Sequence, residues 1–140
     1  MSKLAMAEPI GSVVLNGIFD RFPDSRIGMM ESGAGCFSWY AEYCGHTREQ
    51  QRFWTDSVIG KLPSWYMNRN VWGSFIPYRT GILMPDLPGG RNLMWSSDYP
   101  HFETRFPNSH AIIKRAFAGV EHKEIQDVIC NNAEKLLRIS

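Results

Sequence analysis

The sequence lacks a strong charge of either sign and lacks any long apolar run. The formal net charge is +1 over 140 residues, so there is no electrostatic case for binding nucleic acid or an anionic membrane. No apolar stretch approaches the ~20 residues that a membrane-spanning helix needs. Residues 1–11 lack the apolar region of a secretory signal. We therefore expect a protein with no nucleic-acid and no membrane partner.

Cysteine is scarce, and internal repeats, low-complexity segments and linkers are not seen. Three cysteines cannot all pair, which fits a reducing compartment such as the cytoplasm. Cys36, Cys44 and His46 lie close in sequence, but their spacing matches none of the usual zinc patterns, so we predict no zinc site there. The length suits one domain over residues 1–140, whereas a complete eight-stranded (β/α)₈ barrel needs about 250 residues.

What the sequence does contain is an alternation of helical and strand patterns. Short apolar runs bounded by turn residues predict three strands, and apolar residues at helical spacing predict the segments between and after them. Alternation of this kind implies a parallel sheet with helical crossovers. The predicted strands are Arg26 to Met30, Asn70 to Phe75 and Leu93 to Ser96, and the predicted helices are Pro9 to Phe22, Phe37 to Gly45 with helical character resuming from Thr47 to Trp54, Arg79 to Met84, Asn108 or Ser109 to Phe117, and Lys123 to Arg138.

Aromatic residues are dense in the middle of the chain. Phe53, Trp54, Trp65, Tyr66 and Trp72 lie within 20 positions. Aromatics this dense usually form core or the wall of an apolar pocket. We favour core, because large aromatic side chains dominate the buried area of most folds.

Polar side chains follow two of the predicted strands at the point where each strand ends. Asp98 and His101 come after the third strand, and Glu31 and Ser32 come after the first. In parallel α/β folds the chemistry lies where strands end and loops begin. Asp98 can ligate a metal, accept a proton or cap a turn. Glu31 can pair with an arginine instead, and Ser32 can cap the next helix.

Several of these segments together resemble the amidohydrolase-related metal-dependent hydrolases, the branch that includes aminocarboxymuconate-semialdehyde and resorcylate decarboxylases. The segment from Trp95 to His101, with the sequence Trp-Ser-Ser-Asp-Tyr-Pro-His, is similar to the last-strand motif of that barrel. The segments from Phe19 to Gly28 and from Glu31 to Gly35 resemble the helix and strand of the sixth unit, and the segment from Asn132 to Leu136 resembles the closing helix. The resemblance implies an α/β fold: the last three β/α units of a TIM barrel, with a C-terminal helix pair.

The resemblance also implies a chemistry. In the family a divalent metal, zinc or manganese, polarises the substrate or a bound water, and Asp98 matches the position of a metal ligand or general base. Glu31, Ser32 and His101 would then line the site of a small carboxylated or cyclic substrate that is hydrolysed or decarboxylated. The His-x-His pair of the first family strand does not occur in this sequence. One carboxylate cannot hold a catalytic metal tightly, because such sites need about three protein ligands.

We therefore expect the isolated chain to be inactive and to require a complementing N-terminal barrel half, and a homo-oligomer is an open alternative. A second hypothesis from a different class also remains open. On this hypothesis the chain is a non-catalytic α/β domain whose open sheet edges pair with another chain, because an open edge is a template for pairing.

Overall fold

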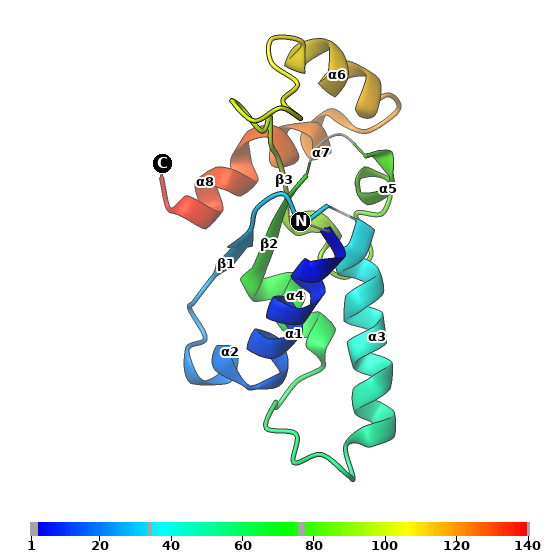
Figure 1. Ribbon diagram of the computed structural model, residues 1–140, viewed down its shortest axis with the longest axis vertical. Helices are drawn as coiled ribbons and strands as arrows, with labels where there is room; N and C mark the ends of the chain where they lie inside the picture. The colour runs from blue at the N-terminus through cyan, green and yellow to red at the C-terminus, as the bar shows by residue number, and fades with distance from the viewer. Residues whose placement is uncertain (1–2, 34, 76–77, 140) are drawn as a thin grey trace.

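The fold is built on a three-stranded parallel sheet (Figure 1). The computed structural model describes residues 3–33, 35–75 and 78–139. Strands β1 (Ile27–Met29), β2 (Val71–Phe75) and β3 (Leu93–Trp95) lie in the order β1-β2-β3, and both neighbouring pairs are parallel. Gly73 in the middle strand aligns with Met29 on one side and Leu93 on the other. The predicted α/β class, parallel sheet and strand order are confirmed.

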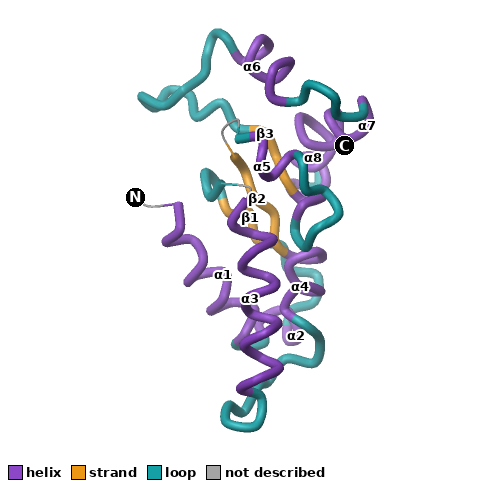
Figure 2. The backbone as a smooth tube through the Cα atoms, turned by 90° about the vertical axis from the view of Figure 1, so that its right-hand side faces the viewer, coloured by secondary structure: helices purple, strands orange, loops and turns teal. Residues whose placement is uncertain are grey.

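Helices precede, separate and follow the strands (Figures 1 and 2). A π-helical segment, Asp127–Asn131, joins the last two helices into one continuous rod. None of the described helices is long and apolar enough to cross a membrane. The helices are α1 (Ala7–Leu15), α2 (Ile18–Arg21), α3 (Gly35–Gln51), α4 (Pro63–Asn70), α5 (Arg79–Ile82), α6 (Ser109–Ala116), α7 (His122–Gln126) and α8 (Asn132–Leu137), with 3₁₀ turns at Lys3–Met6 and Gly90–Asn92.

Three helical predictions need correction. The helix predicted from Pro9 to Phe22 is divided into α1 and α2, because Gly17 adopts a left-handed conformation with φ of 67°. The two segments predicted on either side of His46 form the single helix α3, which runs through Gly45 without interruption. Helix α4 was not predicted. It begins with Pro63 at its first position, where proline is well tolerated because its missing N–H would have had no helical partner.

Helices α3 and α8 lie on opposite faces of the sheet (Figure 1). A Cβ placed on Gly73 would meet the ring of Phe37 in α3, and one placed on Gly28 would meet Leu136 in α8. Gly28 aligns with Trp72, the residue before Gly73, and successive strand residues point to opposite faces. The strands are therefore covered on both sides, and this leaves their carboxyl ends and the following loops as the accessible rim.

The aromatic prediction is correct for some residues and wrong for others. Tyr66 and Trp72 are buried, whereas Phe53 and Trp54 are 80% and 88% exposed and Trp65 is also exposed. Phe53 and Trp54 were predicted as core. They follow the end of α3, in the stretch 52–62 that leads away from the sheet, and the described residues include no second layer to cover it.

Three buried asparagine side chains form hydrogen bonds that link the start of each strand to the adjacent segment of the chain. Asn70 precedes β2, Asn92 precedes β3, and Asn132 begins α8; all three side chains are buried. Each Nδ2 donates to backbone carbonyls of the segment that lies beside it, at 2.7–3.2 Å. The acceptors are Pro23 and Ser25 for Asn70, Met67, Asn68 and Val71 for Asn92, and Arg91 and Leu93 for Asn132.

The packing of α1 against α3 gives a first prediction. A Cβ on Gly11 would lie 2.1 Å from the hydroxyl oxygen of Tyr40. We expect Gly11→Ala to lower the free energy of unfolding by about 1–3 kcal/mol, because the extra methyl overpacks this contact. Urea unfolding measures the loss.

Two further variants test whether the loss in Gly11→Ala comes from the contact with Tyr40. Tyr40→Phe removes the clashing oxygen, so the double variant should recover part of the loss. Gly45→Ala in α3 is the matched control, because an added Cβ there meets nothing within 4 Å. It should stabilise the chain by about 0.5–1 kcal/mol through helix propensity. Equal effects of the two alanine substitutions would contradict this packing.

Candidate functional site at the carboxyl edge of the sheet

The loops that follow β1 and β3 emerge at the same edge of the sheet, because all three strands run parallel. Glu31 lies in the first loop and Asp98 in the second. The middle strand contributes Ser74, whose buried hydroxyl accepts the backbone N–H of Glu31 at 2.8 Å. Ser74 therefore fixes the first loop against the strand that separates the two predicted polar clusters.

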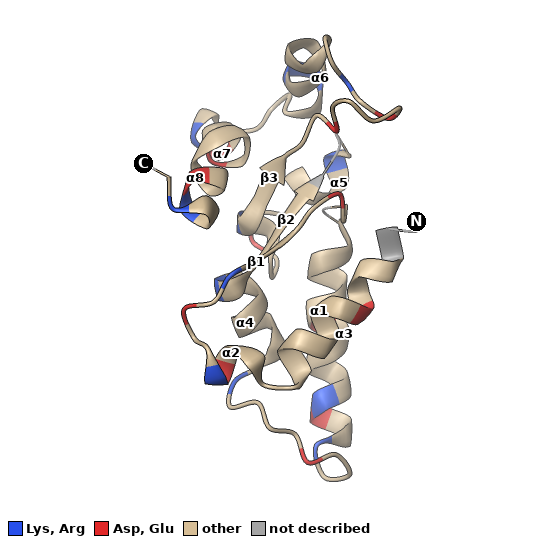
Figure 3. Ribbon diagram, turned by 60° about the vertical axis from the view of Figure 1, so that its left-hand side comes forward, with Lys and Arg blue, Asp and Glu red and all other residues tan. Residues whose placement is uncertain are grey.

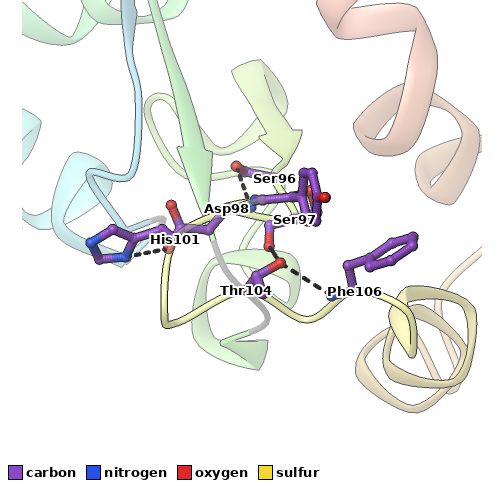
Figure 4. Close-up of polar contacts among 7 residues, drawn as sticks. Ser96, Ser97, Asp98, His101, Thr104 and Phe106 are labelled. Atoms are coloured by element: carbon purple, nitrogen blue, oxygen red, sulfur yellow. Dashed lines mark hydrogen bonds and ion pairs between the residues drawn. The ribbon is translucent and has the colours of Figure 1, made fainter.

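Asp98 is a buried carboxylate beside a partly exposed imidazole (Figure 4). Its side chain is 4% exposed, and its Oδ2 lies 3.1 Å from Nδ1 of His101. The backbone N–H of His101 also donates to the carbonyl of Asp98 at 2.8 Å. The turn from Asp98 to His101 thus brings together two groups that can exchange protons or ligate a metal.

Hydrogen bonds within residues 96–106 hold this turn in shape (Figure 4). Ser96 Oγ accepts the N–H of Asp98 at 3.4 Å. Thr104 closes the loop, because its hydroxyl donates to the carbonyl of Ser97 at 2.9 Å and accepts the N–H of Phe106 at 3.2 Å. The orientation of Asp98 is therefore set by hydroxyl groups on both sides of it.

Ser32 and Cys36 are engaged with the backbone of the first loop. The Ser32 hydroxyl is buried and donates to the carbonyl of Met29 at 2.8 Å. The Cys36 thiol donates to the carbonyl of Gly33 at 3.1 Å, and burial raises the pKa of that thiol. Cys36 is therefore a poor thiolate donor near neutral pH. In this arrangement Ser32 holds the turn, and its predicted contact with a substrate stays a prediction.

Backbone strain is concentrated at this edge. Among the described residues, three that are not glycine have a positive φ: Glu31 at 56°, Asp98 at 58° and Arg138 at 56°. Two of the three are the acidic residues that follow β1 and β3. Such conformations cost about 1–2 kcal/mol for most residues, and strained positions of this kind cluster at functional sites. Aspartate is among the residues that tolerate this conformation, so the cost falls mainly on Glu31.

The donor groups at this edge are too few to bind a metal tightly. The described residues contain no group of three or more His, Cys, Asp or Glu side chains that could hold a metal ion together. Asp98 offers a carboxylate oxygen, and His101 offers a ring nitrogen whose availability depends on its contact with Asp98. Tight catalytic sites use about three protein ligands. Asp98 and His101 alone fall short of that number.

Sequence reasoning missed Ser74 and Thr104, which position Glu31 and Asp98. Ser74 lies in a predicted strand, where one polar residue within an apolar run is a weak signal of a partner on the buried face. Thr104 lies in a stretch without periodicity, so nothing in the sequence linked it to Ser97, seven positions away.

No protein-family model matches the chain, and no curated protein matches it. Solved structures do. An amidohydrolase from Mycobacterium avium subsp. paratuberculosis superimposes with a TM-score of 0.83 at 18% identity, over 100% of this chain and 34% of that one. A 5-carboxyvanillate decarboxylase from Novosphingobium aromaticivorans, with bound manganese and 3-methoxy-4-hydroxy-5-nitrobenzoic acid, gives a TM-score of 0.80 at 12% identity, over 98% and 40%.

A third similar structure is a dihydroxybenzoic acid decarboxylase from Polaromonas sp. JS666, with bound manganese and the inhibitor 2-nitroresorcinol. It gives a TM-score of 0.74 at 14% identity, over 98% of this chain and 41% of that one. The chain thus spans about a third to two fifths of these enzymes. At such low identity the likeness concerns the fold, and in fold it confirms the predicted resemblance to the amidohydrolase-related enzymes.

The geometry of Asp98 gives a second prediction. Asn tolerates the left-handed conformation of position 98, whereas Ala does not. We expect Asp98→Ala to lower the free energy of unfolding by about 1–2 kcal/mol, since it keeps the strained backbone without a residue suited to it. Asp98→Asn should be at least as stable as the parent chain, because a buried carboxylate is itself costly. Thermal and urea unfolding compare the two variants.

Comparing Asp98→Ala with Asp98→Asn shows whether the negative charge of Asp98 has a structural or a functional role. A loss above about 1 kcal/mol in Asp98→Asn would show that the carboxylate supports the fold, and would count against its being retained for chemistry.

Proposed function

We propose that this chain supplies the last three strand–helix units of a barrel-type, metal-dependent hydrolase or decarboxylase. The observation that carries the proposal is Asp98, a buried carboxylate in a left-handed conformation just past the end of β3, in contact with His101. Barrel enzymes place their catalytic groups at this end of the strands. The likeness in fold to manganese-containing decarboxylases supports the same assignment.

Asp98 would serve as a ligand of the divalent metal or as the general base. A carboxylate oxygen suits manganese and is also acceptable to zinc. When bound, the metal would polarise the substrate or a water molecule. The two donor groups of Asp98 and His101 fit part of such a site, so the remaining ligands must come from outside this chain.

Glu31, Ser32 and His101 would line the substrate side of the site. Glu31 lies on the exposed side of the first loop, and His101 lies at the exposed end of the contact with Asp98. Both could contact polar groups of a small carboxylated or cyclic substrate. Ser32 would act mainly by holding the Glu31 turn, since its hydroxyl is already bonded to Met29.

The second candidate function is pairing with another chain. In the described sheet β1 and β3 are the outer strands, and each leaves one side without a strand neighbour. The partner would be a complementing N-terminal barrel half or a second copy of this chain. The first candidate already requires such pairing, so the two differ in whether the assembled protein performs catalysis.

Metal titration tests the proposal. We expect calorimetric titration of the chain alone with Mn²⁺ or Zn²⁺ to show weak binding and turnover assays to show no activity, because one buried carboxylate cannot hold the ion. Joined to an N-terminal barrel half, in cis or as a separate chain, the protein should bind metal stoichiometrically and turn over substrate. Asp98→Asn should then abolish turnover in either role, and loss of metal binding as well would identify Asp98 as a ligand, since the variant removes the carboxylate charge without disturbing the turn.

The matched control is Asp56→Asn, which removes an exposed carboxylate from the stretch after α3. It should leave metal binding unchanged. Stoichiometric binding and turnover by this chain alone would contradict the proposal. Unchanged activity of the assembled Asp98→Asn protein would contradict it as well.

A further inference from the structure

A groove lies between the end of α1, the second half of α3 and the stretch that follows α3, at the end of the molecule that is remote from the candidate active site (Figure 1). Its volume is about 260 Å³. None of its lining residues belongs to a strand or to the loops that carry Glu31 and Asp98. The lining residues include Leu15, Tyr40, Tyr43, Thr47, Gln51 and Thr55.

Exposed aromatic side chains surround this groove. Tyr43 lines it and is 52% exposed, and Trp39 stacks on Tyr43 with ring centroids 5.5 Å apart. Phe53 and Trp54 are 80% and 88% exposed, and they lie in the chain between two residues that line the groove. The backbone that carries these two rings therefore borders the groove. Four large rings in water on one surface are typical of a site that another protein covers.

The groove is large enough to receive one of these rings. A cavity of about 150 Å³ holds a benzene molecule, so a groove of about 260 Å³ can accommodate the larger indole of Trp54. In its own chain Trp54 is exposed and leaves the groove empty. A surface that carries a projecting ring beside a receiving groove is complementary to itself. Two copies related by a twofold axis would bury both rings at once.

The charges beside the rings also suit a second copy. Figure 3 shows basic and acidic residues together on the end of α3 and the loop after it. Arg52 and Asp56 flank the two rings in sequence and are exposed, and among the described residues neither forms an ion pair. A twofold arrangement can place Arg52 of one copy opposite Asp56 of the other. The surface therefore avoids the like-charge repulsion that a strongly basic or acidic face would meet in a homodimer.

The exposed area is sufficient for a dimer of modest affinity. Aromatic side chains bury about 200 Å² each, so Trp39, Tyr43, Phe53 and Trp54 together expose about 550 Å² in one copy. Two copies would bury about 1,100 Å² through these rings alone. Specific interfaces begin at about 1,200 Å² in total, and Leu15, which is 41% exposed at the groove, adds to the area.

We propose that this surface joins two copies of the chain in a closed, twofold homodimer, in which Trp54 of each copy inserts into the groove of the other. A partner that completes the sheet would bind along β1 and β3 and would leave the groove open. The dimer is thus independent of the proposed catalytic function, and its test needs neither metal nor substrate.

Sedimentation velocity of the unaltered chain, at concentrations from about 1 to 300 μM, is the first test. We expect monomer at the low end, dimer at the high end and no larger species, with a dissociation constant in the micromolar range, because the buried area is at the lower limit for a specific interface. A chain that stays monomeric throughout would overturn the proposal. Assembly that continues beyond the dimer would overturn it too, since a twofold contact closes.

Two variants then locate the interface. Trp54→Ala should weaken dimerisation at least tenfold, because a tryptophan that fills a pocket usually dominates an interface. Thr47→Trp fills the groove from its own wall and should weaken dimerisation similarly. Phe102→Ala is the matched control: it removes an aromatic ring that is 86% exposed in the loop after β3, and it should have no effect. Dimerisation that survives both interface changes would show pairing elsewhere, such as along the sheet edges, and would overturn the proposal.

Mixing the two interface variants gives the sharpest test. The Trp54→Ala chain keeps its groove but lacks the ring, and the Thr47→Trp chain keeps the ring but lacks the groove. A mixed dimer regains one of the two contacts, whereas either variant alone has none. The equimolar mixture should therefore dimerise at least tenfold more tightly than either variant by itself. Recovery requires that both variants fold. No recovery from variants that circular dichroism shows to be folded would contradict the insertion of Trp54 into the groove.

Discussion

Buried asparagine side chains are the constraint on which the rest of the structure depends. Asn92 donates to the carbonyls of Met67 and Asn68, which belong to the last turn of α4, and to the carbonyl of Val71 at the start of β2. Asn70 and Asn132 make equivalent contacts one unit before and one unit after it. The same kind of amide-to-carbonyl contact recurs at successive strand–helix units, so the start of each strand is fixed relative to the neighbouring segment.

Because the starts of the strands are fixed, both edges of the sheet are affected. At the carboxyl edge, parallel strands aligned in this way release the Glu31 and Asp98 loops on the same side, where their left-handed conformations are held by Ser74 and by the turn to His101. At the other edge, the contacts of Asn70 hold the carbonyls of Pro23 and Ser25, just before β1, against the end of α4.

The sequence predicts the alternation of elements and the strands well, because each strand is a short apolar run between clear turn signals. It also places Asp98 and Glu31 just past strand ends, as observed. It fails where tertiary context decides: Phe53 and Trp54 look like core but lie on the uncovered stretch after α3, and α4 lacks a strong apolar stripe. Arg-Asn followed by two apolar residues occurs at 69–72 and again at 91–94, a short repeat that marks the asparagine contacts and was overlooked.

The central claim is that these amide contacts, rather than the apolar core alone, hold the strands in their register. Urea unfolding of Asn92→Ala tests it most directly, with Gln126→Ala on the exposed side of α7 as the control. Removing the Asn92 donor leaves three backbone carbonyls without this partner, so we predict a loss of about 2–4 kcal/mol, against less than about 0.5 kcal/mol for the control. A loss in Asn92→Ala no larger than that of the control would contradict the account.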